Sequence, residues 1–262
     1  MYLMFTDETN TRPSPDVKFF IYGGLLLPIE KIVTLDAEIE SIRVRAGYTP
    51  EQEFKFDTRS RPSQVTRAAF TQAKNEVIDS CFSQGVKLIV HIILHDIIKN
   101  QDPEKHVQWA ADYVIGKFNQ FLGGKANDYG MCVVDNLPRN YQFRYLTDKF
   151  VLGLKFNKKA AIKLDRIKLF AASCINASHL SSATDIVLGS FRYCINNPKN
   201  SDAAKQMMGK VVELLWGEKD DKSYRVVGAG LIVRPPIDQI SVLKYKSEYE
   251  ALFKHINGLL AS

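Results

Sequence analysis

The chain has 262 residues, of which 45% are hydrophobic, enough to bury one sizeable core, and no long Pro-, Gly- or Ser-rich linker divides it. Its formal net charge of +6 is compatible with a polyanionic partner without requiring one. We find no N-terminal leader, no apolar run of about 18 residues and no C-x-x-C pair among the four cysteines, so we expect a cytoplasmic protein with free thiols.

The first strand is predicted at residues 1–8, an apolar run that ends in two carboxylates, Asp7 and Glu8. The turn-rich segment 9–16 leads to a second apolar run at 19–27, so the two runs predict an N-terminal β-hairpin. Neighbouring side chains of a strand point to opposite faces, so Asp7 and Glu8 diverge unless the strand has already ended. An acid at the end of a buried strand is costly without a cation or a donor, which makes Asp7 a candidate metal ligand. The alternative is an acid that caps the following turn.

Helices and strands alternate along the rest of the chain. The expected helices cover residues 29–47, 62–84, 103–122, 142–152, 180–195, 201–216 and 245–260. The expected strands cover 86–94, 129–134, 167–173 and 226–233; segment 53–56 is a short strand or extended loop, and 57–63 an exposed loop. This order predicts an α/β fold with a mixed sheet and helices on both faces, in one domain over 1–262 with residues 197–262 as a C-terminal elaboration.

Two histidines, His91 and His95, lie four residues apart within the most apolar expected strand. That spacing places both on one face of a strand. They are either a metal-binding pair or, as is more usual on an apolar strand, packed side chains.

A basic run precedes the expected strand at 167–173. Residues 155–168 hold a single acid, Asp165, and the basic residues Lys155, Lys158, Lys159, Lys163, Arg166 and Lys168. Such runs usually form a solvated surface, and they can also follow a phosphate backbone. Because acids suited to phosphodiester chemistry accompany this run, we expect Lys155, Lys158, Lys159 and Lys163 to bind nucleic acid.

Three acids occupy apolar elements, where a charge is unfavourable. Asp7 and Asp135 each end an apolar strand, and Asp185 interrupts the apolar face of the helix at 180–195. If the two strands are parallel and adjacent, Asp7 and Asp135 are neighbours, because parallel strands end at the same edge of a sheet. Carboxylates held close together share a proton or a cation. Two or three of them on Mg²⁺ or Mn²⁺ would polarise a phosphoryl oxygen and activate water.

Several motifs together resemble the "domain of unknown function 3800" family. They are Phe5-Thr-Asp-Glu-Thr-Asn10, Gly23-Gly-Leu-Leu-Leu-Pro28, Glu53-Phe-Lys55, Asp135 and Ala183-Thr-Asp185, and the resemblance extends over residues 1–195. It implies a ribonuclease H-like fold and a divalent-metal-dependent phosphodiesterase site. On this resemblance the metal ligands are Asp7, Glu53, Asp135 and Asp185, with Glu8 and Lys55 nearby.

The chain departs from the family pattern at two places. Asn10 stands where the family has Gly, although Asn tolerates the left-handed conformation. Ser182 and Thr184 replace the usual Gln and Ala before Asp185. Two functions therefore stay open: a nuclease acting on DNA or RNA, which the resemblance links to bacterial defence against mobile elements, and a catalytically inactive binding or regulatory module. Formation of a homodimer also stays open.

A second acid occurs in a similar setting. Ala111-Asp-Tyr-Val-Ile-Gly116 resembles Thr184-Asp-Ile-Val-Leu-Gly189. We expect Asp112 to be a helix-surface acid, because it precedes the Asp135 strand and the late acid of a ribonuclease H-like order follows the last core strand.

Overall fold

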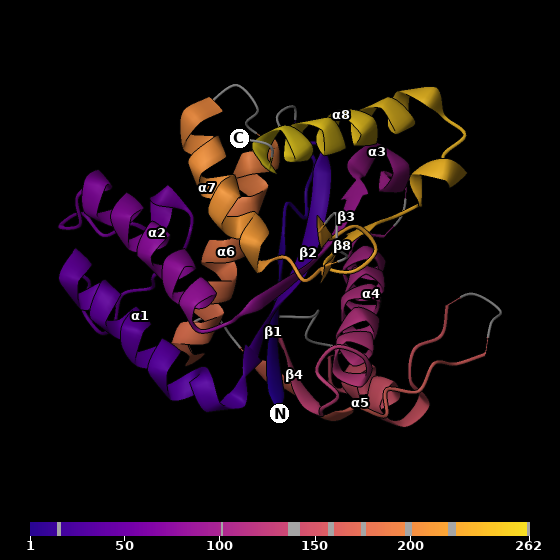
Figure 1. The fold of residues 1–262 in the computed structure, drawn as a ribbon, viewed down its shortest axis with the longest axis horizontal. Helices are drawn as coiled ribbons and strands as arrows, with labels where there is room; N and C mark the ends of the chain where they lie inside the picture. The colour runs from indigo at the N-terminus through magenta and orange to yellow at the C-terminus, as the bar shows by residue number, and fades with distance from the viewer. Residues whose placement is uncertain are drawn as a thin grey trace.

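A six-stranded mixed sheet lies at the centre of the protein (Figure 1). The computed structural model describes residues 1–14, 17–100, 102–135, 142–156, 160–173, 177–196, 201–219 and 224–260. The sheet order is β5-β4-β1-β2-β3-β8. The strands are β1 (Tyr2–Thr9), β2 (Phe19–Pro28), β3 (Lys87–Leu94), β4 (Gly130–Asp135), β5 (Ile167–Ser173) and β8 (Leu231–Val233). The two short strands β6 (Glu218–Lys219) and β7 (Tyr224–Arg225) form a separate hairpin.

The strand directions follow from the chain connections. β1, β2 and β3 pair antiparallel in sequence, which confirms the predicted N-terminal hairpin. β4 is parallel to β1 and β5 is parallel to β4, whereas β8 joins the far edge parallel to β3. An antiparallel β1–β2–β3 set with two further strands added beside β1 is a ribonuclease H-like arrangement, as the family resemblance implied.

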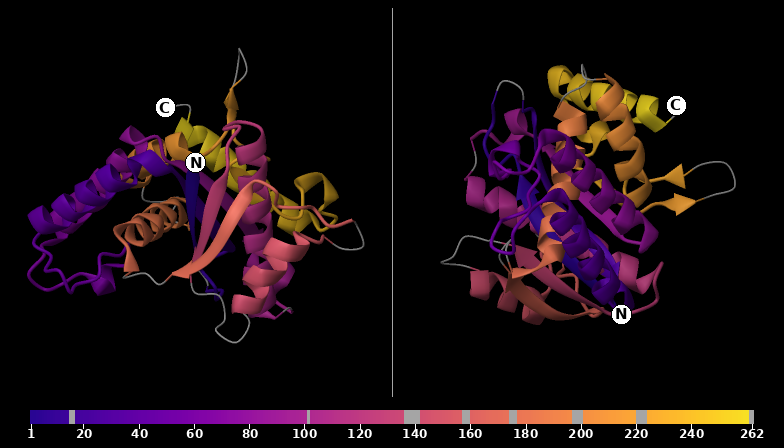
Figure 2. Two further views of the ribbon diagram at one scale, coloured as in Figure 1. Left: turned by 90° about the horizontal axis from the view of Figure 1, so that it is seen from below. Right: turned by 90° about the vertical axis from the view of Figure 1, so that its left-hand side faces the viewer.

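Helices cover both faces of the sheet, as the alternating pattern predicted. The helices are α1 (Ile32–Ala46), α2 (Arg67–Ser83), α3 (His95–Ile98), α4 (Pro103–Gly123), α5 (Gln142–Leu152), α6 (His179–Asn196), α7 (Ser201–Leu214) and α8 (Leu243–Leu260). α1, α2, α6, α7 and α8 share one apolar core with the sheet, and α4 and α5 share the other. The left view of Figure 2 shows the α1–α2 pair and α4 on opposite sides of the sheet.

Residue alternation divides the strands between these two cores. In β1, Leu3 and Phe5 pack against the α6 core, and Met4 belongs to the α4 core. In β4, Cys132 and Val134 face the α4 core. Side chains two residues apart share a face, so Asp7 follows Leu3 and Phe5 toward the α6 side of the sheet.

Some predicted boundaries were wrong. The helix expected at 29–47 begins with a 3₁₀ turn, and the helix expected at 62–84 begins only at Arg67, where Thr66 caps it by accepting the amide of Ala69. Segment 53–56 is a loop, one of the two forms expected for it, whereas the strand expected at 226–233 is reduced to its last three residues.

The interpretation of His91 and His95 as strand neighbours was also wrong, because β3 ends at Leu94 and His95 begins α3. His91 is fully buried and stacks on Tyr113 with ring centroids 5.3 Å apart. Burial, with a contribution from Arg234, lowers the pKa of His91 to about 3, so the ring is neutral. His91 is therefore a packed core residue.

Two further sequence expectations concern thiols and membranes. Cys81, Cys132 and Cys194 are free and buried, and Cys174 lies outside the described residues. Within the described chain, every helix is too short or too polar to cross a bilayer.

Candidate active site

Asp7 and Asp135 end up side by side because β1 and β4 are adjacent and parallel. The last paired residues of the two strands are Thr6 and Val134, and the two acids come next along each chain. Both side chains are partly buried at the carboxyl ends of their strands. In open α/β sheets this edge is where ligands bind.

A close approach of α6 to the sheet adds Asp185 to the pair. Gly23 lies opposite Asp7 in the β1–β2 ladder. A Cβ atom on Gly23 would lie 2.4 Å from Leu188 Cδ2, so α6 packs at this distance only against glycine. Leu188 is one helical turn from Asp185, and the contact therefore brings that acid over the end of β1.

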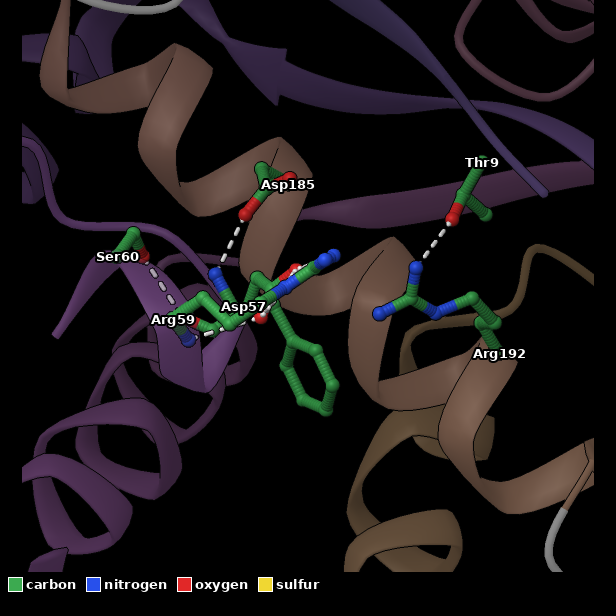
Figure 3. A network of polar contacts seen from close by, with 7 residues as sticks. Thr9, Asp57, Arg59, Ser60, Asp185 and Arg192 are labelled. Carbon is green, nitrogen blue, oxygen red and sulfur yellow. Dashed lines mark hydrogen bonds and ion pairs between the residues drawn. The ribbon is translucent and has the colours of Figure 1, made fainter. Parts of the chain in front are cut away.

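A second glycine lets the segment before α2 reach α6. A Cβ atom on Gly189 would lie 2.3 Å from Phe56 Cγ. With glycine there, the Phe56 backbone N–H donates to Asp185 Oδ2 at 2.6 Å. Figure 3 shows Asp185 directed toward the segment that carries Asp57 and Arg59.

The carboxylates of this region repel one another. Burial raises the pKa of Asp7 well above its usual range, and Asp185, Glu8 and Asp135 raise it further. Burial and then Asp135 raise the pKa of Glu8 to about 7. Burial also raises the pKa of Asp185, although the Phe56 amide, Arg192 and Lys55 oppose that shift. These shifts place the carboxylates within electrostatic reach of one another.

A cavity of about 290 Å³ opens between β1 and α6. Its wall includes four acids, namely Asp7, Glu8, Asp57 and Asp185, together with the guanidinium of Arg192. At about 30 Å³ per water molecule, the cavity has room for roughly ten waters. It can therefore admit a hydrated cation together with part of an anionic substrate.

Two of the sequence-predicted residues lie beside this cavity. Glu53 and Lys55 form an ion pair with each other. Glu53 lines a neighbouring hollow with Asp36 and Arg43, whereas Lys55 is close enough to lower the pKa of Asp185. Neither residue lines the cavity itself; Asp57, two residues beyond Lys55, does.

The predicted phosphate-binding lysines lie on another part of the molecule. Lys155 and Lys163 are exposed in the connection between α5 and β5. This connection packs through Leu154 into the α4 core, on the opposite face of the sheet from α6. Lys158 and Lys159 lie outside the described residues.

Three residues of the site were not singled out from the sequence: Asp57, Lys74 and Arg192. Lys74 is buried in α2, with its Nζ 4.2 Å from the ring centroids of both Phe56 and Phe70. Burial lowers the pKa of Lys74 to about 8, an effect that Asp185 opposes. A lysine on the apolar face of a predicted helix was the available signal for this residue.

Asp112 is not the surface acid that we expected. Its carboxylate accepts hydrogen bonds from Tyr145 Oη at 2.6 Å and from Lys149 Nζ at 2.8 Å, and its side chain is 13% exposed. The three residues join α4 to α5. Asp112 therefore forms a shielded ion pair in the opposite helix layer from Asp185.

The acids suit a hard divalent cation in chemistry and charge. Carboxylate oxygens are the ligands that Mg²⁺ and Mn²⁺ prefer. Glu8 Oε2 is buried without a hydrogen-bond partner in the described part of the chain, and Asp7 carries repulsion that a cation would relieve. Over the described ranges, however, no three His, Cys, Asp or Glu side chains already stand in a metal-binding arrangement. The donors therefore fit a cation, and ligation requires side-chain adjustment.

Several solved structures are similar to the chain. One is the ribonuclease H2 from Pyrococcus horikoshii OT3, at 13% identity and a TM-score of 0.41, covering 80% of this chain and 86% of that one. Bst-RNase HIII in complex with Mn²⁺ has 9% identity and a TM-score of 0.38, covering 81% and 62%. A mutant of Bst-RNase HIII has 9% identity and a TM-score of 0.39, covering 80% and 61%.

The chain thus spans about three fifths of the length of the two ribonuclease HIII chains. No protein-family model matches it, and no curated protein matches it. With such distant similarity, the chemistry has to be argued from the chain's own side chains.

Proposed function

We propose that the protein is a divalent-metal-dependent nuclease that hydrolyses phosphodiester bonds of nucleic acid and belongs with the "domain of unknown function 3800" proteins. The observation that supports this most directly is the position of Asp7 and Asp185 in the wall of one cavity, with Asp135 next to Asp7 at the sheet edge. Both neighbours raise the pKa of Asp7. Acids that repel one another are held close together at this sheet edge, and a bound cation would stabilise that arrangement.

Asp7, Asp135 and Asp185 would hold Mg²⁺ or Mn²⁺, which when bound polarises a phosphoryl oxygen and lowers the pKa of water. Burial and Asp135 raise the pKa of Glu8 to about 7, and this carboxylate would accept the proton of the attacking water at neutral pH. Glu53 would join the ligands by leaving its ion pair with Lys55. Lys55 would then offset negative charge that develops on the phosphate.

Nucleic acid would extend beyond the cavity onto basic side chains. Lys155, Lys158, Lys159 and Lys163 are the proposed backbone contacts, and Lys155 and Lys163 have the exposure that this role needs. Phosphate contacts of this kind release counterions, so affinity would fall steeply as salt rises. Defence against mobile elements is the biological setting that we propose with the family resemblance.

The test is cleavage of end-labelled DNA, RNA and DNA–RNA hybrid oligonucleotides by protein freed of metal and then given Mn²⁺ or Mg²⁺. We expect cleavage that chelator abolishes and that Asp7→Asn and Asp185→Asn reduce by at least a hundredfold. Asp148→Asn, an exposed acid of α5, is the matched control and should cleave like the wild type. Equal cleavage by Asp7→Asn and the wild type would exclude this chemistry.

An inactive binding or regulatory module is the second candidate. It is favoured by the ion pair between Glu53 and Lys55 and by the lack of a ready metal-binding group over the described ranges. Such a module would bind oligonucleotides without cleaving them, and chelator would not change its affinity.

A further inference from the structure

One face of α6 carries both a carboxylate and a guanidinium into the cavity. Asp185, Leu188, Gly189 and Arg192 all line it, at the i, i+3, i+4 and i+7 spacing of a single helix face. At 1.5 Å per residue, Asp185 and Arg192 are about 10 Å apart along the axis. The cavity therefore has a carboxylate end near Asp185 and a cationic end at Arg192.

The guanidinium of Arg192 is oriented by a hydroxyl and an aromatic ring, and the carboxylates of Asp57 and Asp185 lie within reach of its charge. Its Nη1 donates to Thr9 Oγ1 at 3.0 Å, and its Cζ lies 5.6 Å from the centre of the Phe56 ring. Figure 3 shows Arg192 directed from α6 toward Thr9 at the end of β1. A hydroxyl and an aromatic ring orient the positive charge and leave it available to an anion.

The charge of Arg192 affects the pKa values of neighbouring ionisable groups. It opposes the rise in the pKa of Asp185 and contributes to the lowered pKa of Lys74. Beside Arg192, the cavity wall continues through Thr9, Asn10 and Thr11, which bring hydroxyl and amide groups to the same end. The Asn10 side chain donates to the Phe19 carbonyl at 3.0 Å, which holds this turn against β2.

We infer that Arg192 and the Thr9–Thr11 turn form the subsite that binds the phosphodiester group of the substrate, next to the acids. A planar guanidinium matches two phosphate oxygens at once, and the neighbouring hydroxyls supply further donors. Without a bound metal ion the acids would repel an anion, and Arg192 adds a fixed positive charge to the same wall that favours its entry. This inference rests on the proposed function for the identity of the anion.

The alternative role for Arg192 is structural: it would balance the acids and tie α6 to β1 through Thr9. A structural role predicts that its loss lowers stability without a specific change in phosphate binding. A substrate role predicts a change in both affinity and salt dependence, because a phosphate contact contributes about one to the slope of log K against log salt.

The experiment measures binding of a fluorescein-labelled thymidine dodecamer by anisotropy over a range of salt, in chelator so that the strand is not cleaved. We expect Arg192→Gln to weaken binding about tenfold or more and to lower the salt slope by about one. Arg192→Lys keeps the charge, so it should keep the slope and lose only part of the affinity. The matched control is Arg144→Gln, an exposed arginine of α5, which should bind like the wild type.

Calorimetry of Mn²⁺ binding separates this inference from the proposed function. Mn²⁺ should bind Arg192→Gln at least as tightly as the wild type, because the substitution removes a cation from the site. If the protein binds no Mn²⁺ but binds the dodecamer in a way that depends on Arg192, the phosphate subsite is supported and the metal-dependent nuclease function is contradicted. The subsite would be overturned if Arg192→Gln bound the dodecamer with wild-type affinity and wild-type salt slope. It would also be overturned if the variant bound more weakly with an unchanged salt slope, or if the wild type did not bind the dodecamer.

Discussion

Asp7 and Glu8 show how adjacent carboxylates acquire different surroundings. β1 continues through Thr9, so the two side chains diverge, and Asp7 takes the α6 side of the sheet. Glu8 lies opposite Tyr22 in the hairpin, and its pKa rises to about 7. The sequence showed the two acids but not their burial, because burial depends on α6 and on β4.

Glu8→Gln is predicted to stabilise the metal-free protein more at pH 8 than at pH 5. The folded pKa of about 7 lies above the usual 4.5, so folded Glu8 keeps a proton that the unfolded chain releases. Its contribution to stability is therefore lost as pH rises from 4.5 to 7. The variant should gain roughly 2.5 kcal/mol relative to the wild type between pH 5 and pH 8.

Urea unfolding at both pH values measures this difference. The titration of His91, which opposes that of Glu8 below pH 6.5, is common to both proteins and cancels in the comparison. If the free energies of unfolding of the two proteins changed equally with pH, Glu8 would be a solvated carboxylate with an ordinary pKa.

At the scale of elements, two glycines decide how closely α6 fits the rest of the site. Gly23 lets the helix meet β2, and Gly189 lets it meet the Phe56 segment. Their neighbours Leu188 and Phe56 then fix where Asp185 lies. Neither contact could be inferred from the sequence, because each joins segments that are far apart in the chain.

Gly189→Ala is predicted to destabilise the protein by roughly 1–3 kcal/mol, since the new methyl group would overlap Phe56 and displace the segment that holds Asp185. The matched control is Gly209→Ala in α7, where a Cβ atom meets nothing within 4 Å. That variant should gain up to about 1 kcal/mol from helix propensity. Thermal unfolding of both variants tests the contact, and equal shifts would mean that the Phe56 segment yields freely.

The elements themselves were largely predictable, and their ends were not. Apolar periodicity predicted β1, β2, β3 and α4, because each buries a continuous face in the core. It misjudged the start of α2, where local capping by Thr66 decides the boundary. It also assigned 57–63 to an exposed loop, although Asp57 lines the cavity.

On the scale of the whole molecule, the site and the basic connection lie at opposite ends of β4. Asp135 ends that strand, and Lys163 lies four residues before β5, which begins level with Gly130. Five residue steps along a strand correspond to about 17 Å. Because the two also lie on opposite faces of the sheet, a nucleic acid that touched both would cover at least about 5 base pairs of duplex at 3.4 Å each.

The double substitution Lys155→Glu and Lys163→Glu is therefore predicted to weaken binding of a long duplex about tenfold or more and to lower the salt slope by about two. A duplex shorter than 5 base pairs should lose much less. Lys205→Glu, an exposed residue of α7, controls for net charge. If the control and the double variant weaken binding equally per charge, the basic connection is only a solvated surface.

Calorimetric titration of Mn²⁺ into chelator-stripped protein tests whether Asp7 and Asp135 serve one cation, and it requires no knowledge of the substrate. We expect binding by the wild type and by Asp148→Asn, and its loss in both Asp7→Asn and Asp135→Asn. Binding that survives in either variant, or its absence from the wild type at millimolar Mn²⁺, would contradict a shared metal site.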